Sequence, residues 1–258
     1  MSFKNRLRFA TKLSLFHLII SIAVASLTAL LVFKVWYAYP FYRSLGGVTL
    51  FFLVASVDVV CGPLMTLILA NPEKSRKETV LDLSLVGIIQ LSALIYGMHT
   101  VYIARPVYYA FDKDRFSTVT VAQLEKDDIA KALPELQSLP KFGPRQISLK
   151  KNSSTNMDDI TLSLSGVEPI ARPNNWQIYD KERDIAAVRS VMKPVAKLYE
   201  IRANKDKKSL IDKAVANTNL ESDKVFFIPF TTDKSLDWSA LLDENGEIVG
   251  YVDADGFQ

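Results

Sequence analysis

The stretch LSLFHLIISIAVASLTALLVF, Leu13 to Phe33, decides the fold class of this chain of 258 residues. Across its 21 residues it holds one histidine and otherwise only apolar residues, serine and threonine. A helix of that length crosses a hydrocarbon core of roughly 30 Å. The apolar run exceeds the roughly 7 to 15 residues of a signal peptide, and Val32-Phe33-Lys34 is a poor cleavage site. We therefore expect a retained transmembrane helix over residues 13–33.

Two further apolar runs follow, at residues 46–70 and 80–104, and neither contains lysine or arginine. Gly, Pro, Asp and Gln interrupt them, but their length still favours spanning helices. The remaining residues, 105–258, are mixed in polarity and too numerous for a linker. The expected fold is three transmembrane helices in residues 1–104, followed by a small α+β domain in residues 105–258.

The basic residues are distributed unevenly, and this predicts the orientation. Residues 1–104 carry nine Lys or Arg and four acids, whereas residues 105–258 carry 22 basic and 24 acidic residues. Four basic residues precede the first span and three lie between the second and third, so the N-terminus and that loop are expected in the cytoplasm. The domain after the third span then lies on the other side of the membrane, and no basic domain for nucleic acid is indicated.

Local patterns predict several elements of the C-terminal domain. A helical spacing of apolar residues runs from Asp184 to Arg202, with Pro194 as an expected kink. Asn245-Gly246 is a strong hairpin signal between two strands. The other expected elements are a strand followed by a helix from about Val121, a polar loop with one strand within 150–175, a helix at 205–216, and strands at 224–230, 236–243 and 247–253.

Catalytic and metal chemistry find no support in the sequence. His17 and His99 differ in depth by roughly 20 Å along their helices, so they cannot share a metal ion. Asp58 and Asp82 differ by about 13 Å, too far for two carboxylates sharing a proton, and Asp82 is better explained by a helix start. Cys61 is expected to be a small buried side chain. We therefore expect no catalytic residues, cofactor or metal site.

Asp58 nevertheless needs an explanation, because an ionisable group at mid-membrane costs roughly 2.5 to 3.5 kcal/mol. If the second and third spans are centred on the bilayer, Gln90 lies at the depth of Asp58. Gly62-Pro63 would free backbone carbonyls and permit close approach of helices. We expect a packing or partner-binding cluster of Asp58, Gly62, Pro63 and Gln90 with a nearby serine, Ser21 or Ser26. Two alternatives stay open: a protonated Asp58 that is merely tolerated, and a carboxyl that meets a polar group on another protein's helix.

One set of residues runs through the three spans and the junction behind them and returns near the C-terminus. It comprises Gly47, Val57-Asp58, Gly62-Pro63-Leu64, Thr66-Leu67-Ile68, Lys74, Asp82-Leu83, Gln90-Leu91, Ala93-Leu94, Tyr96-Gly97, Arg105-Pro106-Val107, Phe111 and Asp114-Arg115-Phe116, with ALLDENGEIV at 240–249. In these residues the sequence resembles the TfpX/TfpZ family of type IV pilin accessory proteins, over roughly residues 1–120 and more weakly at the C-terminal strands. Cys61, Asn71-Pro72 and the segment after Phe230 depart from the family's pattern.

The resemblance implies a multi-pass protein of the bacterial inner membrane whose C-terminal domain is periplasmic and joined to the membrane part at Arg105 and Pro106. Its implied function is to assist assembly or surface display of a cognate major type IV pilin, without enzymatic activity. The implied partners are that pilin, other inner-membrane components of the pilus and the lipid bilayer. Two alternatives remain at this stage: a membrane-anchored sensor or transport accessory with a ligand-binding domain, and a pilin-modifying enzyme.

Overall fold

The structure is a computed structural model that describes residues 3–150 and 166–257. The chain divides into two compact units, which are described separately. The helical unit comprises residues 1–38 and 46–104, and the sheet unit comprises residues 39–45 and 105–258. The short segment 39–45, which includes the single turn α2 (Phe41–Ser44), thus belongs with the C-terminal domain although it lies between two spans in the sequence.

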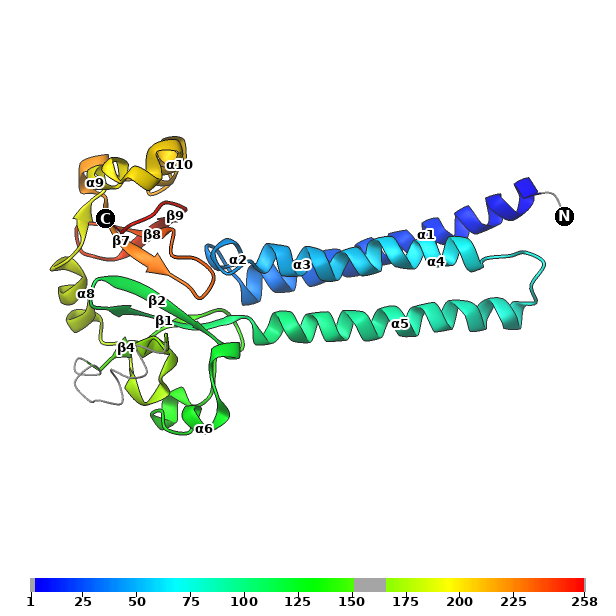
Figure 1. The fold of residues 1–258 in the computed structure, drawn as a ribbon, viewed down its shortest axis with the longest axis horizontal. Helices are drawn as coiled ribbons and strands as arrows, with labels where there is room; N and C mark the ends of the chain where they lie inside the picture. The colour runs from blue at the N-terminus through cyan, green and yellow to red at the C-terminus, as the bar shows by residue number, and fades with distance from the viewer. Residues whose placement is uncertain (1–2, 151–165, 258) are drawn as a thin grey trace. The chain divides into compact units, whose positions relative to one another are not determined.

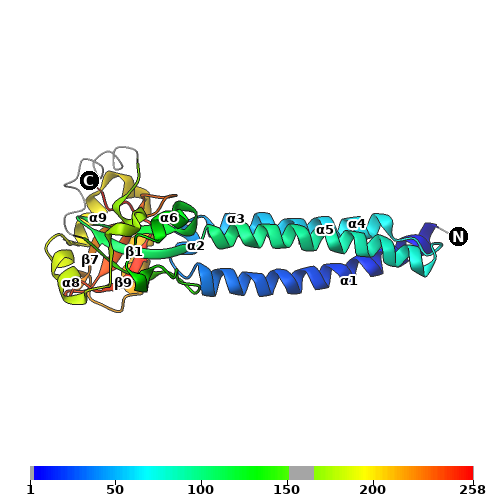
Figure 2. The ribbon, with the colours of Figure 1, turned by 90° about the horizontal axis from the view of Figure 1, so that it is seen from below.

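Within the described residues, three helices are long and apolar enough to cross a membrane, as the sequence predicted. The first is α1 (Phe3–Leu30), which ends in a π-helical segment (Leu31–Trp36). The second consists of α3 (Gly47–Ser56), a π-helical turn (Val57–Cys61) and α4 (Gly62–Leu69). The third is α5 (Arg76–Ile103). The second helix contacts both of the others, and all three run side by side in Figures 1 and 2.

The start of α5 corrects the role expected for Asp82. A capping box of Ser75 and Glu78 begins the helix, so Asp82 lies in its second turn and not at its start. The Asp82 carboxylate accepts a hydrogen bond from the Lys74 ammonium, with 2.5 Å between Nζ and Oδ2. An ion pair with the preceding loop therefore accounts for Asp82 better than the helix dipole does.

Seven strands form one sheet among the described residues of the sheet unit, in the order β3-β1-β2-β7-β8-β9, with β6 pairing beside β7. Strands β1 and β3 and strands β2 and β7 pair in parallel, and the other pairs are antiparallel. The bounds are β1 (Pro106–Asp112), β2 (Arg115–Thr120), β3 (Arg145–Gln146), β6 (Lys193–Pro194), β7 (Phe226–Thr231), β8 (Trp238–Leu242) and β9 (Ile248–Val252).

The hairpin predicted at Asn245-Gly246 is confirmed, because β8 and β9 pair on either side of it. Gly246 has a φ of 84°, a conformation that glycine adopts without a steric penalty. The register shifts by one residue where Leu241 pairs with Gly250 and Leu242 pairs with Ile248. Val249 is therefore the extra residue of a bulge in β9.

Two predicted helices are wrong in extent. After β2 the chain forms only a 3₁₀ turn (Val121–Gln123) and a single turn, α6 (Lys126–Ile129). The long helix predicted at 184–202 is two short ones, α8 (Lys181–Arg189) and α9 (Ala196–Glu200), separated by β6. Pro194 lies in β6, which pairs with β7, so the sheet interrupts the helix there.

Strand β1 was not predicted, and the strand expected within 150–175 falls mostly outside the described residues. The helix predicted at 205–216 is present as α10 (Lys208–Ala216), preceded by a 3₁₀ segment (Arg202–Lys207). A separate two-stranded sheet pairs β4 (Ser148–Leu149) with β5 (Trp176–Gln177). The remaining short 3₁₀ turns are Pro134–Leu136, Pro169–Ala171, Pro173–Asn175 and Ser222–Lys224.

The core of the sheet unit consists of two apolar clusters. One packs α9 and α10 against the C-terminal strands through Val195, Leu198, Ile211, Val215, Val225, Phe227, Leu241, Val252 and Ala254. The other surrounds β1 with Val107, Tyr108, Ala110, Val119, Ala132, Ile147, Ile170 and Trp176. Helices α9 and α10 therefore fix the position of the β8–β9 hairpin.

Candidate functional site

The residues predicted to cluster in the membrane meet at the irregular turn of the second helix. A residue at position 63 would donate its N–H to the carbonyl four or five positions earlier, but Pro63 has none. The π-helical turn Val57–Cys61 lies immediately before it. The side-chain amide of Gln90, on α5, donates to the backbone carbonyl of Asp58, with 3.1 Å between Nε2 and O. A side chain from the neighbouring helix thus replaces a donor that proline removes.

Gly62 allows this contact. A Cβ at position 62 would lie 2.0 Å from Nε2 and 2.5 Å from Cδ of Gln90, closer than any real contact. The amide of Gln90 therefore occupies the space that a side chain at position 62 would fill. Gly97, further along α5, likewise leaves room for a side chain of the neighbouring helix, because a Cβ there would lie 2.6 Å from both Cγ atoms of Val54. Small residues at helix interfaces let backbones approach closely in membranes.

Polar contacts also join the first helix to the second. The hydroxyl of Ser14 donates to the carbonyl of Pro63 at 2.8 Å, and the imidazole Nδ1 of His17 lies 2.6 Å from the hydroxyl of Thr66. His17 thus packs the first helix against the second. Of the two serines expected near the cluster, Ser26 donates to the carbonyl of Ile22 within its own helix, and Ser21 is buried.

The carboxyl of Asp58 is enclosed by the helices of its own unit. The residue is 7% exposed, and Oδ1 has no hydrogen-bond partner among the described residues. The hydrogen bond from Gln90 goes to the backbone of Asp58, which sequence reasoning did not anticipate. A partner helix would reach the buried Oδ1 only if the three helices separated, so the geometry favours packing over direct recognition.

Cys61 does not occupy the buried position expected for it. Its side chain is exposed on the surface of the helical unit, because the π-helical turn changes which residues of this helix face its neighbours. No group of three or more His, Cys, Asp or Glu side chains within the described ranges is placed to hold a metal ion.

Arg105 and Pro106, expected at the junction of the two parts of the chain, follow the C-cap of α5, Ala104, and begin the second segment of the sheet unit. Arg105 is 3% exposed, and its guanidinium donates to the carbonyl of Pro140 at 3.3 Å. Its own carbonyl accepts from the N–H of Val121 at 3.1 Å. Pro106 opens β1 opposite Thr120. Both residues thus anchor the first strand inside the sheet unit.

A shallow apolar groove lies on the outer surface of the helical unit, between the first and second helices. Its volume is about 330 Å³, and sequence reasoning did not identify it. Small residues from both helices are among those that line it, so a further helix would approach closely there. The lining residues are Ile22, Ala25, Ser26, Ala29, Phe51, Phe52, Ala55, Ser56, Val59 and Val60.

We expect Asp58→Asn to leave the stability of the full chain in detergent within about 1 kcal/mol of wild type, because volume and polarity are retained. Asp58→Leu is expected to lower the melting temperature, because a branched apolar side chain must fit beside Gln90 in a packed interface. Thermal unfolding of the purified chain measures both. An unchanged melting temperature for Asp58→Leu would mean that the position tolerates any side chain and that the polar cluster does not fix the packing.

The family profile described as "Fimbrial assembly protein FimB" matches residues 5–47. The chain is 35% identical to "Fimbrial assembly protein, serogroup I" and 35% identical to "Fimbrial assembly protein, serogroup E1", both of Dichelobacter nodosus. Each alignment covers 99% of both chains. "Fimbrial assembly protein, serogroups C1 and C2", of the same organism, is 45% identical over 129 residues, which are 50% of this chain and 98% of that protein. No solved structure matches.

Proposed function

This chain belongs to the fimbrial assembly protein (FimB) family, and from that membership we propose that it assists assembly or surface display of a cognate major type IV pilin. The observation that carries the proposal is the alignment with fimbrial assembly proteins over 99% of both chains. The resemblance to the TfpX/TfpZ accessory proteins at Asp58, Gly62-Pro63 and Gln90 supports the specific role of a pilin accessory factor.

The proposed location is the inner membrane, with the N-terminus in the cytoplasm and the sheet unit in the periplasm. The support is the bias of Lys and Arg towards the N-terminus and towards the loop between the second and third helices. If all three helices of membrane-spanning length cross the bilayer, the two ends of the chain would lie on opposite sides of it. Residues 1–104 would then act in the membrane and residues 105–258 in the periplasm.

The proposed mechanism uses two contacts, one in each unit. A pilin subunit waiting in the membrane has an apolar helix and a periplasmic head, so an accessory factor gains selectivity by contacting both. The groove between the first and second helices fits the first contact, because Ala25, Ala29 and Ala55 permit close helix packing there. The contacts of Ser14 with Pro63 and of His17 with Thr66 join the two helices that form this groove, and Gln90 joins the second of them to α5. The proposed action involves no catalysis.

Filling the groove tests this proposal. Ala29→Leu and Ala55→Leu are expected to reduce the yield of pilin crosslinked to this chain by at least about tenfold, because side chains placed in a helix interface prevent close approach. Surface piliation is expected to fall in parallel. Gly87→Leu is the matched control, because a Cβ at Gly87 meets no atom within 4 Å and Gly87 does not line the groove.

A deletion strain, together with the groove variants, tests the other parts of the proposal. Deleting the gene is expected to reduce surface pili while leaving the mass of the remaining pilin unchanged. Normal piliation in the deletion strain would reject the assembly role, and a changed pilin mass would indicate a modifying enzyme instead. Equal crosslinking by the groove variants and the Gly87→Leu control would reject the groove while leaving the assembly role standing.

A further inference from the structure

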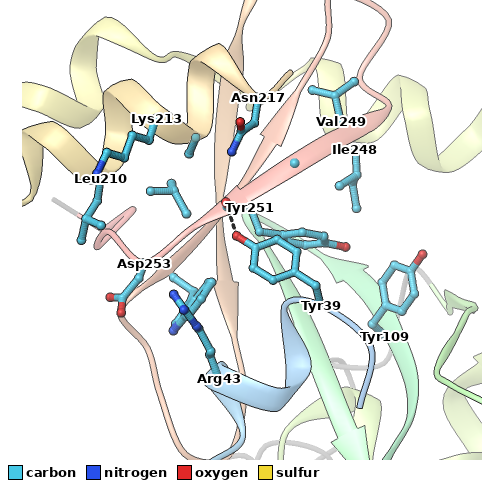
Figure 3. Close-up of a pocket in the computed structure, with 14 residues that line it drawn as sticks. Tyr39, Arg43, Tyr109, Leu210, Lys213, Asn217, Ile248, Val249, Tyr251 and Asp253 are labelled. Atoms are coloured by element: carbon cyan, nitrogen blue, oxygen red, sulfur yellow. Dashed lines mark hydrogen bonds between the residues drawn. The ribbon is translucent and has the colours of Figure 1, made fainter. Parts of the chain in front are cut away.

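The sheet unit contains an elongated groove of about 530 Å³ that follows the outer edge of strand β9. Six consecutive residues, 248–253, line it, so its floor is the strand itself. One wall is a face of α10, whose residues Leu210, Lys213 and Ala214, with Asn217 at its C-cap, recur at the spacing of a single helical face. The other wall comes from Tyr39 and Arg43, as Figure 3 shows.

The edge of β9 carries backbone groups that can pair with a further strand. Strand β9 ends the order of the sheet, and no described strand pairs with its outer side. The carbonyl of Tyr251 faces this side, because it accepts a hydrogen bond from the hydroxyl of Tyr39 at 2.8 Å. Backbone groups alternate in direction along a regular strand, so those of Asp253 face the same way, whereas the bulge at Val249 interrupts the alternation. An exposed edge of this kind accepts extended peptides.

The groove carries an excess of positive charge. Arg43 and Lys213 form no ion pair with any acid in the part of the chain that the structure describes. The one carboxylate among the lining residues, Asp253, is already paired with Lys207 at 2.7 Å. Two exposed cations therefore flank an open strand edge, with the apolar side chains of Leu210 and Val249 exposed beside them.

We propose that this groove binds an extended acidic segment of a partner protein, which adds to β9 as a further strand. Main-chain hydrogen bonds to the outer edge of β9 hold the segment, and Arg43 and Lys213 recognise its carboxylates. The inference deepens the proposed function, and rests on it in one respect, namely that the partner is the periplasmic head of the pilin. The binding chemistry itself depends only on the groove.

Tyr39 occupies the edge in the absence of a partner. Its hydroxyl uses the carbonyl of Tyr251, which an added strand needs, and burial raises the pKa of Tyr39 so that the hydroxyl remains a donor. The ring also packs edge-on against Trp238 and Tyr251, with centroids 6.4 and 6.1 Å apart. Removing only the hydroxyl would leave this ring packing in place. Tyr39 therefore competes with the partner, which predicts the direction of a mutational effect.

The test uses the full chain in detergent and three fluorescein-labelled peptides. These are TVEVEVT, its basic counterpart TVKVKVT, and TVEVEVT with N-methyl groups on alternate residues. Fluorescence anisotropy should show saturable binding of TVEVEVT only, because the basic peptide meets Arg43 and Lys213 and the methylated one cannot donate to the edge. Equal binding of TVKVKVT would overturn the charge recognition, and equal binding of the methylated peptide would overturn strand addition.

Three variants test the proposal further. Reversing both cations, Arg43→Glu with Lys213→Glu, should weaken binding of TVEVEVT at least about tenfold. Reversing Lys126 and Lys141 changes the net charge equally, away from the groove, and should leave binding unchanged. Tyr39→Phe should strengthen binding about threefold to tenfold, because it frees the carbonyl of Tyr251. Weaker binding by Tyr39→Phe, or equal loss in both charge reversals, would contradict the proposal.

Failure of this inference is distinguishable from failure of the proposed function. Peptide binding is measured without pilin, and piliation of a strain carrying Arg43→Glu with Lys213→Glu is measured separately. Loss of peptide binding with normal piliation would reject the pilin head as the partner. If no peptide binds and the chain instead forms dimers that the Arg43 and Lys213 reversals dissociate, the edge pairs with a second copy and the proposal is wrong.

Discussion

Replacing Gly97 with alanine is expected to destabilise the helical unit by about 1 to 3 kcal/mol. The new Cβ would lie 2.6 Å from both Cγ atoms of Val54 and 3.2 Å from its Cβ. Valine is stiff about χ1, so it cannot swing aside, and the second helix must move away from α5. The melting temperature of the full chain in detergent, together with its accumulation in membranes, measures the effect.

Gly87→Ala is the control for this prediction, because it lies in the same helix and its added methyl group meets nothing within 4 Å. Alanine also improves helix propensity by up to about 1 kcal/mol at either position. The difference between the two variants therefore measures the destabilisation caused by the clash with Val54. The control is expected to melt at or slightly above the wild-type temperature. Equal melting temperatures for the two variants would show that the approach of α5 to Val54 contributes nothing to stability.

The membrane-spanning part of the fold was predictable because apolar length is sufficient to identify a spanning helix. The runs at 13–33, 46–70 and 80–104 fall within or close to the three long helices observed. Depth along these helices also placed Gln90 at the level of Asp58. Depth alone does not specify which atom of Asp58 receives the hydrogen bond. The accepting atom depends on the π-helical turn before Pro63, and the spacing of residues in the sequence does not predict that turn.

The C-terminal domain was less predictable because pairings between distant segments override local patterns there. The spacing of apolar residues between Asp184 and Arg202 fits a helix, but the N–H of Val195 donates to the carbonyl of Val225 at 2.9 Å. Pro194 then pairs with Phe226 in the sheet. By contrast, the hairpin at Asn245-Gly246 depends on local turn chemistry, and it was predicted correctly.

The groove along β9 could not be predicted, because one of its walls comes from a segment far away in the sequence. The segment Tyr39–Leu45 lies between two spanning helices in the sequence, and tyrosine is enriched where such helices meet the membrane surface. In the structure Phe41 is buried, and its ring packs against those of Tyr109 and Phe230, with centroids 6.2 and 5.8 Å apart. No pattern within the segment predicts those partners, which follow it by roughly 70 and 190 residues, so the wall that Tyr39 and Arg43 form required the structure.

Gly62→Ala is expected to destabilise the helical unit by about 1 to 2 kcal/mol, because the new Cβ would lie 2.0 Å from Nε2 of Gln90. The amide of Gln90 can rotate away, but it then loses its hydrogen bond to the carbonyl of Asp58. Gln90→Ala is expected to cost a similar amount by removing the same bond. Thermal unfolding of the full chain in detergent measures both single variants.

The double variant discriminates this explanation from general damage to packing. If Gly62 exists to make room for the amide of Gln90, then Gly62→Ala should cost little once Gln90 is already alanine, with a coupling of about 1 kcal/mol. Gly97→Ala combined with Gln90→Ala is the control, because the two sites lie about 10 Å apart along α5 and their effects should add. Additive effects of Gly62→Ala and Gln90→Ala would show that the two residues stabilise the helices independently. The hydrogen bond to Asp58 would then not be the reason for glycine at position 62.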